Sequence, residues 1–282
     1  PRRGRRGSII GILAGALYFA GTIPSTRAHG DDQLLIDALT EELAKAPEAD
    51  LFIRRGELFR HHQEWAKAGA DFESAARLEP KLEIVAFFRA RLLLESGEPA
   101  KARAFIDRYL AGAPGEAEGW FLRGDVLGAI GKHEAGALDY AEGIRRASHP
   151  RPEHFLRRAK FLAAAPEATP TRVLAAVDEG IAKLGPVISL LEYAIALELE
   201  RKNYEGALVR IQKAMEHSPR RETWLVRRGD ILLKFGRTSE AVAAYRAALA
   251  AIEELPPRYR ETVPVEKLER DARASLGQIS SR

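Results

Sequence analysis

The sequence predicts an all-α fold, namely a right-handed helical solenoid of about six helix–turn–helix units with a capping helix at each end. Two observations support this prediction. Hydrophobic residues make up 46% of the 282 residues, alanine and arginine are abundant, and no alternating run rich in valine, isoleucine and threonine occurs, so the composition favours helix over strand. From residue 48 onward the chain also resembles itself at a fixed period, which is typical of repeat proteins.

The period is marked by a small residue that is followed three positions later by a large apolar one. The small residues are Gly56, Ala90, Gly124, Ala159, Ala194 and Gly229, at spacings of 34, 34, 35, 35 and 35 residues. A second ladder of large residues lies downstream, at Phe72, Ile106, Tyr140, Val177, Ile211 and Tyr245. Each unit therefore holds two amphipathic helical segments. Gly97, Gly131 and Gly236 fall between them, where a helix end needs a left-handed residue.

These positions resemble the tetratricopeptide repeat, in which an aromatic, a small and a large apolar residue mark the first helix and alanine and an aromatic mark the second. The third unit carries the pattern best, with Trp120, Gly124, Leu127, Gly131, Gly136 and Tyr140. The fourth unit departs through its longer loop "AAAPEATPTR", and the fifth lacks the aromatic and the turn glycine. The resemblance implies a protein that binds a partner in the concave groove lined by the first helices.

A stack of repeats needs a cap at each end, because every unit has an apolar face that it cannot bury alone. Residues 29–47 predict an amphipathic N-terminal capping helix whose stripe is Leu35, Leu39 and Leu43, with acidic residues 31 and 32 at its start. Residues 48–254 are the repeats. Residues 255–282 predict a loop, 255–264, that does not continue a helix, and then a C-terminal capping helix that turns Val265, Leu268 and Ala272 toward the stack.

The first 28 residues have the order of a secretory signal peptide: a basic start, an apolar run over residues 9–23, and small residues at Thr26 and Ala28. The run is shorter than the roughly 20 residues of a membrane-spanning helix. We therefore expect cleavage after Ala28 and a periplasmic or otherwise exported protein. The alternative is that the run stays as an anchor, which would be the protein's contact with a membrane.

The charge balance argues against a nucleic-acid partner. The formal charge of +4 arises from five arginines that precede the first acidic residue, and the remaining chain carries 39 basic against 40 acidic residues. Cysteine is absent, which excludes disulfides and thiolate catalysis. The sequence holds no glycine-rich phosphate loop, no Gly-x-Ser-x-Gly elbow and no His-Glu-x-x-His motif. It therefore predicts neither a cofactor nor an enzyme.

The residues that follow the small positions alternate in charge along the first units. They could form ion pairs between adjacent units, each contributing little, or line a charged groove that recognises a partner's side chains. Phe87 and Phe121, one turn earlier, could be apolar anchors of that groove or core residues. The candidate partner-binding groove comprises Glu57, Arg60, Phe87, Arg91, Phe121, Asp125, Lys160 and Asp230.

A ladder of arginines precedes the small positions, at residues 55, 89, 123, 158 and 228. Each could pack its stem and reach a neighbouring carboxylate, or together they could bind anions. The tripeptide Arg-Gly-Asp occurs twice in this ladder, but on a helix its two charged side chains point about 200° apart, which argues against an adhesion motif. His149 and His154 flank two prolines; we expect solvated loop residues there rather than metal ligands.

The sequence therefore predicts a non-catalytic interaction scaffold or adaptor outside the cytoplasm, with a protein or peptide partner held in the groove. The alternative is an accessory subunit of an extracytoplasmic enzyme complex that binds anions or a cell-wall polymer through the arginine ladder.

Overall fold

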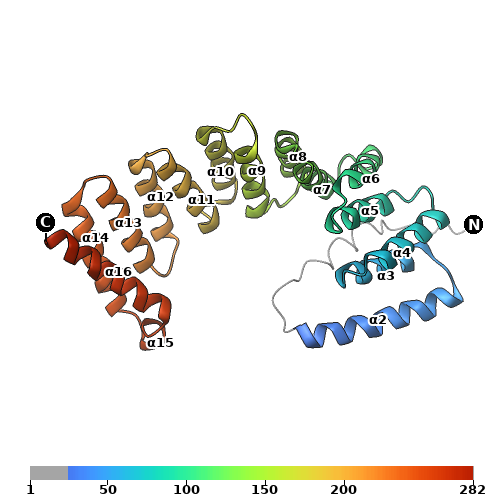
Figure 1. Ribbon diagram of the computed structural model, residues 1–282, viewed down its shortest axis with the longest axis horizontal. Coiled ribbons are helices and arrows are strands. Elements are labelled where there is room, and N and C mark those ends of the chain that lie inside the picture. Colours follow the sequence, from blue (N-terminus) through green and yellow to red (C-terminus); the bar gives the residue numbers. More distant parts are fainter. Residues whose placement is uncertain (1–24, 282) are drawn as a thin grey trace, which may run out of the picture. The chain divides into compact units, whose positions relative to one another are not determined.

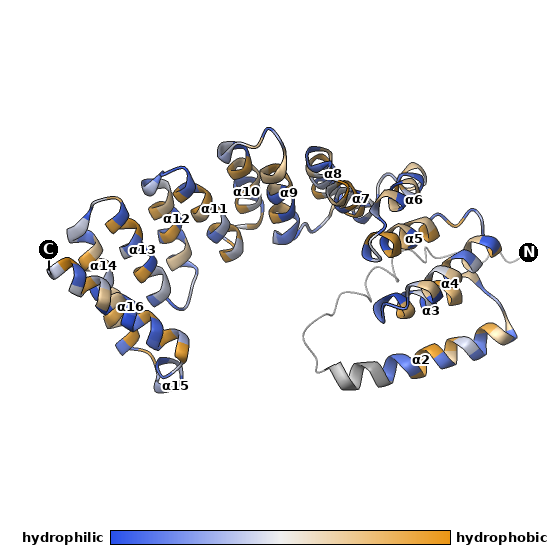
Figure 2. Ribbon diagram, in the orientation of Figure 1, coloured by the Kyte–Doolittle hydropathy of each residue, from blue (hydrophilic) through white to orange (hydrophobic). Residues whose placement is uncertain are grey.

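A computed structural model describes residues 25–281 as a succession of helices, and every regular element in that range is helical (Figure 1). Hydrophobic and hydrophilic residues alternate along most of them (Figure 2). The helices are α2 Ser25–Lys45, α3 Ala49–His61, α4 Trp65–Leu78, α5 Ile84–Glu95, α6 Pro99–Gly112, α7 Ala117–Ala129, α8 His133–Arg146, α9 Pro152–Ala164, α10 Pro170–Leu184, α11 Ile188–Glu200, α12 Tyr204–Glu216, α13 Glu222–Lys234, α14 Thr238–Glu253, α15 Pro257–Arg260 and α16 Val263–Ser280. The predicted signal peptide, with its apolar run over residues 9–23, falls almost wholly outside the described residues.

The helices from α3 to α14 form six consecutive pairs, one for each predicted unit. The pairs are α3–α4, α5–α6, α7–α8, α9–α10, α11–α12 and α13–α14. The second helix of each pair carries one member of the downstream ladder of large residues, and all six of these side chains are buried. The predicted all-α repeat fold is thereby confirmed.

The chain divides into two compact units at residues 92 and 93, near the end of α5. In the first unit α2 packs on α3 and α3 on α4. In the second unit each helix from α6 to α14 packs against the next one along the chain, and α16 packs on α14 and α13. Packing between sequence neighbours is what a stacked repeat requires, because no unit needs a distant segment to bury its apolar face.

The small positions of the first helices are sites of close approach to the second helices. A Cβ atom built on Gly124 would lie 2.6 Å from Cδ2 of Tyr140, and one on Gly229 would lie 2.6 Å from Cε1 of Tyr245. A Cβ atom built on Gly56 would likewise lie 2.6 Å from Cε1 of Phe72. Glycine thus makes room for an aromatic ring at the downstream ladder, which explains why the two ladders repeat together.

The turns within the units need a left-handed residue, as predicted. Gly97, Gly131 and Gly236 have φ angles of 86°, 79° and 81°. The first and fifth repeats lack this glycine, and Gln63 and Lys202 adopt the same conformation there, with φ angles of 59° and 58°. The geometry of the turn is therefore kept where its usual residue is missing, at the cost of backbone strain.

The N-terminal capping helix differs from its prediction in register. The buried stripe of α2 is Ile36, Leu39 and Leu43, whereas Leu35 is 43% exposed. The helix begins at Ser25, so Asp31 and Asp32 do not lie in its first turn. Instead, an Oδ of Asp32 lies 3.3 Å from Nε2 of His62. The predicted stripe was wrong by one residue because Leu34, Leu35 and Ile36 are consecutive, and only packing on α3 selects among them.

The C-terminal cap agrees with its prediction in the residues that it buries. Val265 and Ala272 of α16 are buried, and Leu268 is partly buried against α14. The preceding segment is not wholly a loop, because Pro257–Arg260 forms the single helical turn α15. In the fourth unit, α9 ends at Ala164 and α10 begins at Pro170, which confirms the longer loop there.

Candidate functional site

The eight candidate groove residues all lie on first helices and fall into two groups, one in each compact unit. Glu57, Arg60, Phe87 and Arg91 lie on α3 and α5 of the first unit, and Phe121, Asp125, Lys160 and Asp230 lie on α7, α9 and α13 of the second. Each group is described by itself below.

In the compact unit that ends at Leu92, three charged candidates form one cluster. Nε of Arg60 donates to Oε1 of Glu57 at 2.8 Å, and a terminal nitrogen of Arg91 lies 3.4 Å from Oε2 of the same carboxylate. Glu57 and Arg60 are buried, and the guanidinium of Arg91 lies 4.6 Å from the centroid of the Phe87 ring. Glu57 and Arg91 are one repeat apart, so this contact is an ion pair between two adjacent repeats of the same compact unit.

The two candidate anchors are core residues. The side chains of Phe87 and Phe121 are only 6% and 5% exposed. The ring of Phe121 stacks on the imidazole of His154 at 3.9 Å between centroids and lies against Gly143, where a Cβ atom would come within 2.4 Å of it. Their burial agrees with the interpretation of both phenylalanines as core residues, because no ring surface remains for a partner to contact.

Asp125 joins two first helices and one second helix. Its Oδ1 accepts hydrogen bonds from Nε of Arg157 on α9, at 2.9 Å, and from the hydroxyl of Tyr140 on α8, at 3.0 Å. Burial, and then the negative charge of Asp125, raises the pKa of Tyr140. Arg157 has a half-exposed side chain and was not among the predicted residues. Its position three residues before Lys160 on the same helix could have identified it, since residues at that spacing share a face.

Lys160 and Asp230 are both exposed. Asp230 accepts a hydrogen bond of 2.7 Å from the hydroxyl of Tyr245, so the Asp–Tyr arrangement of the third unit recurs in the sixth. Burial, followed by the hydrogen bond to Asp230, raises the pKa of Tyr245 to about 12. The tyrosine hydroxyls therefore stay protonated donors near neutral pH, and each fixes a carboxylate on the first-helix surface.

The arginine ladder is engaged by carboxylates of the same chain. Arg55 binds Asp71 through two hydrogen bonds of 2.9 and 2.7 Å, and Arg123 binds Asp139 through two of 2.7 and 2.8 Å. Arg89 and Arg158 pair with Glu73 and Glu179 on second helices. The hydrogen bonds to Asp71 and Asp139 raise the pKa of Arg55 and of Arg123.

Three of the five arginines, at 55, 123 and 158, thus link the first helix of a repeat to its own second helix, and Arg89 links α5 to α4, the second helix of the preceding repeat. This agrees with the interpretation in which the arginine head reaches a neighbouring carboxylate. Both Arg-Gly-Asp tripeptides lie inside helices, in α7 and α13, with the glycine packed against a tyrosine ring.

The histidines at 149 and 154 differ from the expectation of two solvated imidazoles. His149 is exposed, but His154 lies in α9, is 7% exposed and stacks on Phe121. Burial, and then the charge of Arg151, lowers the pKa of His154 to about 4. Among residues 25–281 there is no group of three or more histidine, aspartate or glutamate side chains arranged to hold a metal ion.

Comparison with protein families matches residues 87–152 and 189–256 to a tetratricopeptide-repeat model. A comparison with curated protein sequences finds no match. No helix of the described chain has both the length and the hydropathy to cross a membrane.

Solved structures share the fold at low identity. The C-terminal part of a tetratricopeptide-repeat protein from Cytophaga hutchinsonii is 13% identical with a TM-score of 0.57, over 81% of this chain and 95% of that one. A tetratricopeptide-repeat protein from Parabacteroides merdae is 18% identical with a TM-score of 0.53, over 87% and 94%. PilF from Pseudomonas aeruginosa is 13% identical with a TM-score of 0.52, over 79% and 97%. At these identities the likeness shows the fold alone.

Proposed function

The chain is a tetratricopeptide-repeat protein, and we propose that it is a non-catalytic scaffold or adaptor outside the cytoplasm that binds a segment of another protein. Repeats of this kind commonly bind proteins or peptides, and their first helices offer an extended surface for doing so. The order of the N-terminal sequence supports the extracytoplasmic location.

The observation that carries this proposal is the surface made by Asp125, Arg157 and Lys160 on α7 and α9. The hydrogen bond between Asp125 and Arg157 joins the two first helices, and the side chains are 29% and 51% exposed. Lys160 lies one turn further along α9 and is exposed. Both signs of charge are present and held in place by the repeat, so the partner segment should carry charges of both signs.

The alternative of an anion or polymer binder has less support. It requires free guanidinium groups along the ladder, whereas Arg55, Arg89, Arg123 and Arg158 already pair with carboxylates of the chain. A polyanion would have to displace these partners. Binding that weakens steeply between low and moderate salt would favour the polymer, because such contacts are screened by ions.

The test is to recover a partner with the tagged protein from its native extract and to titrate it against Lys160→Glu. We expect affinity to fall roughly tenfold, equivalent to about 1.4 kcal/mol, because a partner carboxylate would meet a like charge. Lys183→Glu is the matched control, since Lys183 is an exposed lysine at the end of α10. Equal binding by both variants and the parent would mean that this first-helix surface is not the binding site.

A further inference from the structure

The ladder arginines of the first and third repeats are held by the same edge of the guanidinium. Arg55 donates from Nε and Nη2 to the two carboxylate oxygens of Asp71, at 2.9 and 2.7 Å. Arg123 donates from the same two nitrogens to Asp139, at 2.7 and 2.8 Å. In both repeats the aspartate directly precedes the buried aromatic residue of the downstream ladder. This edge of the guanidinium, which we call the fork, matches the two oxygens of a carboxylate.

The fourth repeat keeps the arginine but lacks the aspartate. Arg158 is its ladder arginine, and Ala176, which directly precedes the buried Val177, stands where the aspartate would be. Nη1 of Arg158 donates to Oε2 of Glu179, and the arginine side chain is 22% exposed. Among residues 25–281, neither Nε nor Nη2 of Arg158 has a hydrogen-bond partner. The fork of Arg158 is therefore open to a carboxylate from outside the chain.

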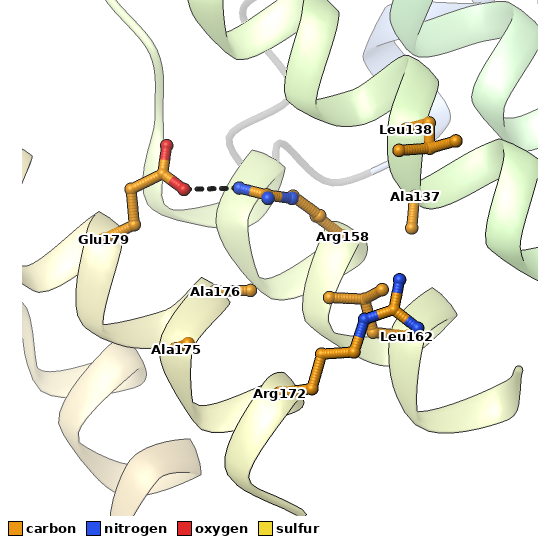
Figure 3. Close-up of a pocket in the computed structure, with 8 residues that line it drawn as sticks. All are labelled: Ala137, Leu138, Arg158, Leu162, Arg172, Ala175, Ala176 and Glu179. Atoms are coloured by element: carbon orange, nitrogen blue, oxygen red, sulfur yellow. Dashed lines mark hydrogen bonds and ion pairs between the residues drawn. The ribbon is translucent and has the colours of Figure 1, made fainter. Parts of the chain in front are cut away.

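A hollow lies at this open fork. It has a volume of about 210 Å³, and Arg158 and Ala176 both line it. In Figure 3 the ion pair between Arg158 and Glu179 lies at one side of the hollow, and Arg172 lies near Leu162 at the other. Most of the remaining lining is apolar and comes from α8, α9 and α10, namely Ala137, Leu138, Leu162 and Ala175. The missing aspartate thus leaves an open guanidinium edge beside an apolar wall.

A ladder arginine of this chain can hold two carboxylates at once. Besides Asp139 at its fork, Arg123 reaches Asp107 of α6 through Nη1, at 3.4 Å. Arg158 already has the second kind of contact, through Nη1 to Glu179, and lacks only the first. A carboxylate at the fork of Arg158 would therefore repeat the arrangement around Arg123, and it would not need to displace Glu179.

We propose that this hollow binds a carboxylate with an adjoining apolar group, and that the carboxylate oxygens accept hydrogen bonds from Nε and Nη2 of Arg158. The carboxylate takes the place that Asp139 has in the third repeat, and the apolar group lies against Leu138 and Leu162. Such a ligand is a free apolar carboxylic acid, or an acidic side chain beside an apolar one in another protein. One arginine edge is enough for this site, whereas the polymer binder considered above needs several ladder arginines.

The hollow is distinct from the first-helix surface that contains Lys160. Arg158 and Lys160 are two residues apart on α9, so their side chains point about 200° from each other. The proposal therefore goes beyond the proposed function and does not rest on it. Loss of carboxylate binding in a variant of Arg158 and loss of partner binding in Lys160→Glu are independent results.

The experiment is a titration of the full chain with sodium butyrate at constant ionic strength, measured by NMR of the arginine Nε–H groups. We expect a dissociation constant on the order of 1 mM, because the probe is small, and binding of the uncharged butyramide that is roughly tenfold weaker or less. Arg158→Lys keeps the charge but does not offer two parallel donors, so it should bind butyrate several-fold more weakly. Arg246→Gln removes an exposed arginine of α14 that does not line the hollow, and it should bind like the parent.

A second variant, Ala176→Asp, restores the aspartate of the third repeat. Its carboxylate should occupy the fork of Arg158, so we expect butyrate to bind roughly tenfold or more weakly. The control is Ala182→Asp, which adds the same charge at an exposed position of α10 that does not line the hollow. The control should bind butyrate like the parent, and Ala176→Asp should melt no lower than it, because the buried aspartate has the arginine as its partner.

A further pair of probes identifies the source of the carboxylate. Octanoate represents a free apolar acid, and a blocked tripeptide with glutamate between two leucines represents a protein segment; the one that binds more tightly indicates the source. Three results would overturn the proposal. They are butyrate binding that does not saturate, equal binding of butyrate and butyramide, and binding that is unchanged in both Arg158→Lys and Ala176→Asp.

Discussion

At the scale of single residues, Gly124 shows how one missing side chain allows two helices to meet. An atom of the Tyr140 ring lies only 2.6 Å from the position that a Cβ atom on Gly124 would have. We expect Gly124→Leu to lower the free energy of unfolding by about 1–3 kcal/mol, because the ring must move to accommodate the added side chain. Gly115→Leu is the control, since nothing lies within 4 Å of a Cβ atom there. Urea unfolding measures both, and equal losses would contradict the close approach.

Asp125, the next residue, has a structural role of its own beside its proposed one. It accepts hydrogen bonds from Tyr140 and Arg157, so Asp125→Ala leaves a mostly buried hydroxyl without its acceptor. We expect a loss of about 1 kcal/mol in urea unfolding. Because this variant changes stability as well as charge, Lys160 is the better residue for testing partner binding.

His154 gives the molecule a dependence of stability on pH. The pKa of its imidazole is lowered to about 4 in the folded chain, against 6.5 for an ordinary histidine, because the ring is buried against Phe121 and lies near Arg151. The folded state thus binds the proton more weakly than the unfolded state. Stability should therefore be unaffected by this group above pH 6.5 and should fall as the pH drops from 6.5 to 4.

The measurement is the melting temperature of the parent and of His154→Phe between pH 7 and pH 4. The phenylalanine keeps an aromatic ring on Phe121 without a titrating group, so the variant should lose less stability on acidification than the parent. His149→Phe, at an exposed position in the preceding loop, should follow the parent. A His154→Phe profile parallel to the parent's would contradict the lowered pKa.

At the scale of elements, the turns test how strictly the repeat needs its glycine. Gly131 has a φ of 79° and Lys202 holds the equivalent position at 58°. We expect Gly131→Ala to cost about 1–2 kcal/mol, because an L-residue is strained in the left-handed region. Lys202→Ala should cost much less, since the strain is already present there. Thermal melts of the two alanine variants decide the matter, and comparable losses would mean that the turn conformation is not the cause.

At the scale of the whole molecule, we expect export. The basic start, the apolar run and Ala28 predict that the mature protein begins at or near His29 and lies outside the cytoplasm. N-terminal sequencing of the protein from fractionated cells measures this. Recovery of soluble cytosolic protein that still carries Arg2 would contradict it, whereas membrane-bound protein with the intact leader would support the anchor.

The sequence by itself determined the repeat, because the period of small and large residues is a local pattern that each unit must satisfy to pack on the next. The six helix pairs, the turn glycines, the longer loop of the fourth unit and the buried face of the C-terminal cap all follow from that pattern. Each depends on neighbours in sequence, which a linear pattern can record.

Only the tertiary structure decided which of the candidate side chains are available. Phe87, Phe121 and His154 are buried, and the ring of Phe121 on α7 stacks on His154 of α9, far from it in sequence. The buried stripe of α2 contains Ile36 and not Leu35, because α2 packs on α3 through one face. The arginine ladder found carboxylates 16 to 21 residues away, a pairing that no spacing in a single helix predicts. The exposure of Leu138 and Val209, at 62% and 57%, was likewise decided by the tertiary structure, because exposure is a property of the assembled helices and of no residue alone.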